Sequence, residues 1–90
     1  MILHIATREA WATARTSGMY WVGDKAFVHF SFASQLADTA ARYYGGVPGL
    51  LVLVVDPDGL DVRVENGFPH LYEPLPVGSV VEVRPLESAI

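Results

Sequence analysis

Six consecutive aliphatic residues, LLVLVV at positions 50–55, constrain the fold of this chain more than any other feature. A strand with one face in water alternates apolar and polar side chains, whereas a strand that is apolar on both faces has to be covered on both sides. The turn residues Pro57, Asp58 and Gly59 follow directly and end the run. The pattern therefore predicts a central strand in a sheet that carries other elements on both faces.

The composition agrees with one small packed domain over residues 1–90. Hydrophobic residues make up 51% of the chain and charged residues only 18%, which is the opposite of the composition of disordered proteins. There is no cysteine, so disulfides, thiol nucleophiles and thiolate zinc sites are excluded. Packing alone has to stabilise the fold.

The charge and hydropathy of the sequence indicate which partners the protein is expected to bind and where in the cell it is expected to lie. The formal net charge is −4, and the six basic residues are scattered singly along the chain, which argues against binding of nucleic acid. The N-terminal segment reaches His4, Arg8 and Glu9 before any long apolar run, and no run approaches the ~20 apolar residues of a transmembrane helix. We therefore expect a cytoplasmic protein that does not contact a membrane.

Two helices are predicted in the first half of the chain. Thr7 is a candidate N-cap for a helix over residues 8–17, which the next glycine would end. A second helix is expected after Ser31 or Ser34, either of which can cap it, and it would run to a glycine pair. The buried stripe of this second helix is expected to contain Leu36, Ala40 and Tyr43 or Tyr44.

The remaining segments favour strands. Besides the central run, extended structure is expected at residues 2–5, 19–22, 26–31, 62–65, 68–72 and 80–86. In the last of these, Val81 and Val83 are expected to lie opposite Glu82 and Arg84. Two early helices and many short strands predict an α+β domain with a curved or split, mainly antiparallel sheet, and not a doubly wound parallel fold.

Three histidines are the first candidates for chemistry. His4, His29 and His70 each lie in an expected strand among apolar neighbours. In the strand over residues 26–31, alternation puts Phe27, His29 and Ser31 on one face. A histidine in a strand often serves only as a hydrogen-bonded packing residue, and this alternative stays open for all three. No two of them have the HxH or HxxxH spacing of zinc ligands, so no metal site is predicted.

Among the carboxylates, Glu65 stands out because it ends an expected strand just before an Asn66–Gly67 turn. The alternative is a solvated charge at the end of a strand. Asp56, Asp58 and Asp61 surround the turn after the central strand, and aspartates are common at such turns.

Five segments occur in a distinctive order: LHIATREAW at 3–11, FVHFSFASQLADTAARYY at 27–44, LLVLVVDPDGL at 50–60, VRVE at 62–65 and GFPHLYEPLPVGSVVEVRPL at 67–86. Together they resemble the bacterial family known as domain of unknown function 952, and the resemblance covers residues 2–86. The chain departs from residues that are usual in this family at Ala26, Phe30, Val64, Gly67 and Glu73.

The family is distantly similar to the ADP-ribosyltransferase fold, in which a split β-sheet holds NAD in a central cleft. The resemblance implies that NAD is bound as a substrate and that His4 corresponds to a histidine that binds its ribose and amide. Further groups that would orient the cofactor are Thr7, His29, Ser31 and Tyr72. With so few cations, phosphate contacts would come from backbone N–H groups or from single residues such as Arg8 and Arg42.

Cleavage of the nicotinamide–ribose bond develops positive charge, which a nearby carboxylate would stabilise. Active transferases place a glutamate near the final motif, where this chain has His70, and Glu65 is the available substitute. We therefore expect Glu65 and His70 to be the catalytic residues.

Three functions stay open at this point. The first is an ADP-ribosyltransferase-like enzyme that acts on NAD in a central cleft. The second is a non-catalytic module on the same fold that binds a small ligand or a protein. The third is a partner-binding domain whose histidines only pack. The sequence makes no prediction about the oligomeric state.

Overall fold

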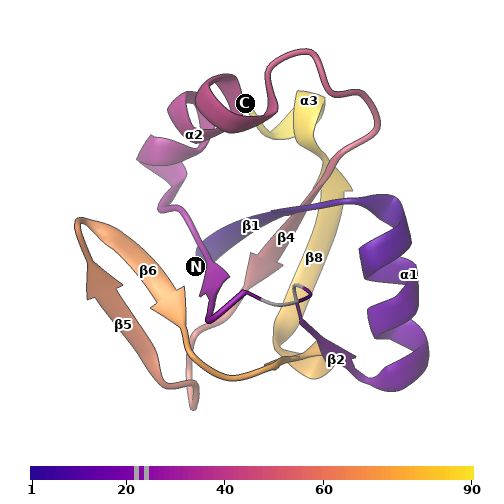
Figure 1. The fold of residues 1–90 in the computed structure, drawn as a ribbon, viewed down its shortest axis with the longest axis vertical. Coiled ribbons are helices and arrows are strands. Elements are labelled where there is room, and N and C mark those ends of the chain that lie inside the picture. The colour runs from indigo at the N-terminus through magenta and orange to yellow at the C-terminus, as the bar shows by residue number, and fades with distance from the viewer. Residues whose placement is uncertain (22, 24) are drawn as a thin grey trace.

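The computed structural model describes residues 1–21, 23 and 25–90 and contains three antiparallel sheets with helices packed around them (Figure 1). The helices are α1 (Arg8–Ser17), α2 (Leu36–Tyr44) and α3 (Leu86–Ala89). The strands are β1 (Ile2–Ala6), β2 (Met19–Tyr20), β3 (Val28–His29), β4 (Leu51–Val55), β5 (Val62–Glu65), β6 (Phe68–Leu71), β7 (Leu75–Pro76) and β8 (Val80–Pro85). The expected α+β class with a split antiparallel sheet and two main helices is confirmed.

The expected central strand is β4. It lies between β1 and β8 in a three-stranded sheet, with Leu53 paired to His4 on one side and to Val83 on the other. Leu53 and Val55 pack into one hydrophobic cluster, and Val52 packs into a second. Because side chains alternate along a strand, these two clusters cover opposite faces of the sheet, as the sequence predicted.

The two clusters hold different elements against the sheet. The larger one joins β1 and β4 to α1, β2, β3 and β6 through residues such as Ala14, Tyr20, Phe30 and Leu71. The smaller one joins the other face to α2 and α3. In Figure 1, α1 therefore lies on one side of the central sheet, and α2 and α3 lie together at one end.

Helix α1 follows its sequence signals. The Thr7 hydroxyl accepts a hydrogen bond from the Ala10 N–H at 3.1 Å, and Gly18 ends the helix with φ 86°. A positive φ of this kind is strained for residues with a Cβ, so glycine is favoured here. The expected helix over residues 8–17 is confirmed at both ends. The extended segment expected over 19–22 is present at Met19–Tyr20, while Val22 lies outside the described residues.

A second three-stranded sheet has the order β3–β6–β5 and projects beside the first (Figure 1). Strands β5 and β6 form a hairpin whose turn residues, Asn66 and Gly67, both have positive φ. Such a turn fits the twist of a hairpin. A single bridge between Leu3 and Ser31 connects this sheet to β1.

The second helix begins differently from the expectation. A 3₁₀ turn at Ala33–Gln35 precedes α2, and neither Ser31 nor Ser34 caps the helix. The Gln35 side chain instead accepts a hydrogen bond from the Phe32 N–H at 2.9 Å. Ser34 lies inside the 3₁₀ turn and Ser31 lies before it, so neither occupies the N-cap position of α2, which is Gln35. Of the two tyrosines considered for the buried stripe, Tyr44 packs inward and Tyr43 is exposed.

The last strand also differs from a regular alternation. Val54 pairs with Glu82 and Val55 pairs with Val80, so the register shifts around Val81. The extra residue in this bulge leaves Val81 exposed, whereas Val80 and Val83 pack against the larger cluster. The expectation that Val81 and Val83 share a face is therefore wrong. The chain then ends in α3, a short helix that the sequence analysis did not predict.

Candidate functional site

The sheet of β3, β6 and β5 presents its polar and aromatic side chains on one face. His29 on β3 lies directly opposite His70 on β6, and His70 lies opposite Arg63 on β5. Cross-strand partners point to the same side of a sheet. The other face carries residues such as Val28 and Leu71, which are fully buried in the larger cluster. The apolar face therefore fixes the sheet to the core and leaves the His-bearing face available.

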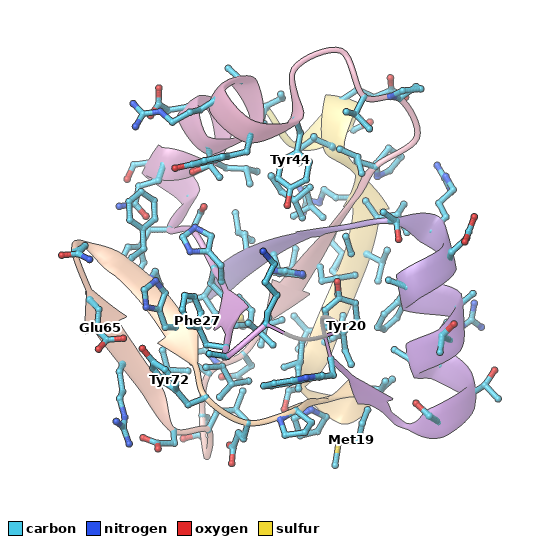
Figure 2. The ribbon with its side chains drawn as sticks, viewed as in Figure 1. Met19, Tyr20, Phe27, Tyr44, Glu65 and Tyr72 are labelled. Carbon is cyan, nitrogen blue, oxygen red and sulfur yellow. The ribbon has the colours of Figure 1, made fainter. Side chains whose placement is uncertain are left out.

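Glu65 is the hydrogen-bonding centre of this face. Its Oε1 atom accepts a hydrogen bond from Nδ1 of His70 at 3.0 Å and a second from the hydroxyl of Tyr72. Both donors therefore act on the same oxygen, Oε1. Figure 2 labels Glu65 and Tyr72, whose side chains lie close together beside the hairpin.

This arrangement favours an ionised carboxylate. The hydrogen bond from Tyr72 is the main cause that lowers the pKa of Glu65 below its usual value, and the hydrogen bond from His70 is the next. The same bond raises the pKa of the Tyr72 phenol. Glu65 is therefore charged at neutral pH, while 45% of its side chain stays accessible to solvent.

Aromatic rings extend the cluster away from the carboxylate. The ring of Phe27 stacks on that of His70 with centroids 4.3 Å apart and an interplanar angle of 15°. The ring of His29 lies 5.4 Å from that of His70 and 5.1 Å from that of Phe68. Burial is the main cause that lowers the pKa of His29, and the nearby His70 adds to it. The sequence-predicted Glu65, His70, His29 and Tyr72 are thus brought together.

His4 has a different environment, because both of its ring nitrogens have partners inside the protein. Nδ1 lies 2.6 Å from the backbone oxygen of His29, and Nε2 lies 2.8 Å from the hydroxyl of Tyr20. A carbonyl oxygen can only accept, so Nδ1 carries the proton and Nε2 accepts from Tyr20. Burial lowers the pKa of His4 to about 4, and burial also raises the pKa of Tyr20 to about 12. Both side chains are uncharged at neutral pH.

A cleft of about 400 Å³ lies between this sheet and α2. Among the described residues, its walls are formed by His4, Lys25, Phe27, His29, Thr39, Tyr43 and Tyr44. Figure 2 labels Phe27 and Tyr44, which come from opposite sides of this region. Most of these residues carry rings, so the cleft suits a flat ligand.

The cleft continues into a small recess of about 30 Å³ that shares His4, His29, Thr39 and Tyr44 with it. Ser31 lines this recess, and its hydroxyl donates to Oγ1 of Thr39 at 3.2 Å. A volume of this size holds a water molecule or a small polar group. Ser31 therefore lines the recess that adjoins the cleft.

Thr7 lies elsewhere. It is exposed, its hydroxyl caps α1, and it does not line the cleft in the described part of the chain. Glu65, His70 and Tyr72 are connected to the cleft through the stacked ring of Phe27, which lines it. The sequence-predicted residues thus form two adjoining groups, one around His4 and one around Glu65.

Several residues of the site were missed by sequence reasoning. Lys25 is the only lysine of the chain and lines the cleft. Tyr43 and Thr39 lie on the side of α2 that faces the cleft, and Tyr20 binds His4. The adjacent pair Tyr43–Tyr44 was an available signal, because two neighbouring tyrosines at a helix end cannot both face the core.

The two arginines expected near phosphate lie outside the cleft. Arg42 forms an ion pair with Asp38 on α2 at 3.4 Å. Arg8 lines a second cavity of about 170 Å³ near the C-terminus, together with residues such as Pro48, Leu86 and Glu87.

Two searches of the described residues concern metals and membranes. No group of three or more His, Asp or Glu residues is arranged to hold a metal ion in that part of the chain. Within the same residues, no helix has both the length and the apolar character needed to cross a membrane.

Comparison with known proteins gives a family and a set of similar structures. A sequence model of the family described as "Protein of unknown function (DUF952)" matches residues 5–83. None of the curated proteins matches the chain. The crystal structure of protein CC0527 from Caulobacter crescentus is similar, with a TM-score of 0.84 and 30% sequence identity over 93% of this chain and 83% of that one. The solution structure of CC0527 gives a TM-score of 0.77 and 32% identity over 93% of this chain and 82% of that one.

Proposed function

The chain belongs to the family described as "Protein of unknown function (DUF952)", and we propose from its own cleft that it binds NAD as a substrate and acts as an ADP-ribosyltransferase-like enzyme. The position of Glu65 carries this proposal. Its carboxylate binds His70, whose ring stacks on Phe27, and Phe27 forms a wall of the aromatic cleft. An ionised carboxylate is therefore linked through His70 and Phe27 to the wall of a cleft that suits a flat ring, and it lies beside the cleft, not in its lining.

The walls of the cleft support NAD as the ligand. Nicotinamide is a flat ring, and Phe27, Tyr43 and Tyr44 offer aromatic surface for it. The hydroxyl of Thr39 and the recess beside Ser31 offer hydrogen-bonding groups for an amide or a ribose hydroxyl. The cleft volume of about 400 Å³ lies in the range of small-molecule sites.

In the proposed reaction, the bond between ribose C1′ and the nicotinamide ring nitrogen breaks, and its electron pair stays with that nitrogen. Neutral nicotinamide leaves, and positive charge develops on the ribose. Glu65 stabilises this charge; because Oε1 already accepts from His70 and Tyr72, Oε2 is the oxygen that turns to the ribose. The oxygen of an acceptor hydroxyl or of water then bonds to C1′, and its proton passes to the Glu65 carboxylate.

His70 and Tyr72 act through Glu65 in this proposal. Both donate hydrogen bonds to it, which keeps it ionised and fixes its orientation. They are positioning residues. His29 and the buried hydroxyls of the recess would orient the ribose and the amide.

One observation favours a second candidate, a module that binds the ligand without turnover. Both ring nitrogens of His4 are engaged by Tyr20 and by the backbone of His29, so His4 has no nitrogen to offer a ligand unless one of these bonds opens. A His4 ring with both nitrogens occupied can contribute ring surface to a ligand but no free hydrogen-bonding group, which supports binding more directly than catalysis.

Nicotinamide release and the melting temperature in NAD separate the two candidates. The enzyme proposal expects NAD to raise the melting temperature and nicotinamide to be released over time. Glu65→Gln should reduce release about 100-fold and keep the thermal shift. Glu82→Gln is the matched control, since the pKa of Glu82 is also lowered, by a hydrogen bond from Arg84.

The outcomes are distinct. A thermal shift with no release in the wild type favours the binding module. Equal release from the wild type and Glu65→Gln contradicts the role of Glu65. No shift at millimolar NAD in folded protein contradicts both candidates.

A further inference from the structure

We infer that Lys25 binds the phosphate attached to the nicotinamide ribose and thereby selects phosphorylated nucleotides over nucleosides in this cleft. The identity of the nucleotide rests on the proposed function. The role of Lys25 as an anion-binding residue rests on its position in the cleft, which is independent of the reaction.

Lys25 is the one cationic side chain among the described residues that line the cleft. The arginine side chains lie outside the cleft. Arg42, Arg63 and Arg84 form ion pairs with Asp38, Asp61 and Glu82. Arg8 lines the second cavity, and Arg15 lies in the last turn of α1. An anionic group bound in this cleft therefore has one side-chain cation to meet.

The other described residues that line the cleft favour an interaction between Lys25 and a phosphate. None of the described lining residues is acidic, so no carboxylate in the wall repels a phosphate. The walls are mainly rings, and a charged group that leaves water for such surroundings needs a partner of opposite charge. A hydrogen bond between an ammonium and a phosphate oxygen is among the stronger polar contacts in proteins.

The chain also places the ring surface and the cation in one segment. Lys25 precedes Phe27 by two residues, and both line the cleft. A ligand ring that packs against Phe27 therefore has its substituents within the reach of the long, flexible lysine side chain. A phosphate one ribose away from the ring fits this arrangement.

The experiment uses two ligands that differ by one phosphate, nicotinamide mononucleotide and nicotinamide riboside, titrated by calorimetry into the full chain. The wild type should bind the mononucleotide about tenfold or more tightly than the riboside, as expected for one charge-assisted contact. Lys25→Gln should remove most of this preference by weakening the mononucleotide alone. Lys25→Arg should retain it. Arg8→Gln is the matched control, because Arg8 lines the second cavity.

A direct readout follows from Lys25 being the only lysine. Reductive ¹³C-methylation keeps the charge of the amine and gives one ε-amine NMR signal besides that of the terminal amine. The mononucleotide and inorganic phosphate should shift this signal, and the riboside should not. A purely structural role of Lys25 would not produce this pattern.

The possible outcomes of these experiments test the role of Lys25 and the NAD proposal separately. If Lys25→Gln binds the mononucleotide and the riboside as tightly as the wild type does, the role of Lys25 is overturned and the NAD proposal stands. If Arg8→Gln loses the preference for the mononucleotide and Lys25→Gln keeps it, the phosphate binds in the second cavity. This result also overturns the role of Lys25. If neither the mononucleotide nor the riboside binds but phosphate shifts the Lys25 signal in the wild type, the anion site stands and the proposed function fails. If the mononucleotide, the riboside and phosphate all have no effect, both proposals fail.

Discussion

His4 and His70 are equally buried, with exposed fractions of 6% and 8%, yet they sit in opposite kinds of environment. Both nitrogens of His4 bind groups of the interior, the backbone of β3 and the hydroxyl of Tyr20. Nδ1 of His70 binds Glu65, a carboxylate that is half accessible to solvent. Burial alone therefore does not distinguish the environments of these two histidines. The partner of each ring nitrogen does.

The two histidines also connect different parts of the fold. His4 joins β1, β2 and β3, which come from separate sheets. His70 joins β6 to its hairpin partner β5 through Glu65 and contacts Phe27 at the cleft wall. We therefore expect changes at His4 to reduce stability more than changes at His70 do.

Replacement of each histidine by alanine gives the largest expected contrast. His4→Ala leaves the Tyr20 hydroxyl and the His29 carbonyl without their partner and opens a cavity, so the free energy of unfolding should fall by about 3 kcal/mol or more. His70→Ala removes one hydrogen bond at the edge of the core and one ring stack, and should cost about half as much. Urea unfolding of both variants measures the difference. Equal losses would remove the distinction between the two sites.

Acid should affect the two regions in different pH ranges. The pKa of His4 is about 4 in the folded protein and 6.5 in the unfolded chain, so the unfolded chain binds more protons between these values. Stability should therefore fall as the pH is lowered from 6.5 to 4, by about 3 kcal/mol in total. Glu65 has a lowered pKa, so its contribution is present at neutral pH and is lost only below its usual value of 4.5.

Urea unfolding at several pH values tests this separation. His4→Gln has no titrating ring at this position, so it should lose most of the slope above pH 4.5. Glu65→Gln should keep that slope. A wild-type stability that is flat between pH 6.5 and 4.5 would contradict the account of His4.

A smaller effect is expected when only the partner of His4 is changed. Tyr20→Phe keeps the buried ring and removes the hydroxyl, which leaves Nε2 of His4 without its donor. The free energy of unfolding should fall by about 1–2 kcal/mol. Tyr43→Phe is the matched control, because Tyr43 is 69% exposed and should change stability little. Similar losses in both variants would show that the Tyr20–His4 bond does not stabilise the fold.

The smallest change in stability is expected at the partner of Glu65. Tyr72→Phe removes the main cause of the lowered Glu65 pKa, so this pKa should rise towards its usual value while the melting temperature stays near that of the wild type. A pH titration of the Glu65 carboxyl signal by NMR measures it, with Glu82 as an internal reference. An unchanged Glu65 pKa would assign its lowering to His70 and Arg63.

Much of the fold follows from local patterns in the sequence. The run LLVLVV specified the central strand, Thr7 and Gly18 specified both ends of α1, and Asn66–Gly67 specified the β5–β6 turn. The N-cap of α2 was predicted wrongly because a 3₁₀ turn precedes the helix, and Val81 was misplaced because its bulge depends on pairing with β4. Both errors concern geometry that distant segments impose.

The sequence predicted which residues lie near one another better than it predicted how they are arranged. Alternation correctly put Phe27 and His29 together, since both line the cleft. It could not show that Phe27 stacks on His70, or that Lys25 and Tyr43 share that cleft. Residue type alone made Arg8 and Arg42 as suitable for phosphate as Lys25.

The sequence by itself determined the class of fold, the buried central strand and the small set of histidines, hydroxyls and carboxylates available for chemistry. Only the tertiary structure decided that His4 is bound at both nitrogens, by groups 16 and 25 residues away, and that Glu65, His70 and Tyr72 act as one cluster. The physical reason is the range of the interactions. Strand pattern, caps and turns are encoded within a few residues, whereas hydrogen-bond partners, ring stacking and the desolvation that shifts a pKa depend on segments that meet only when the chain folds.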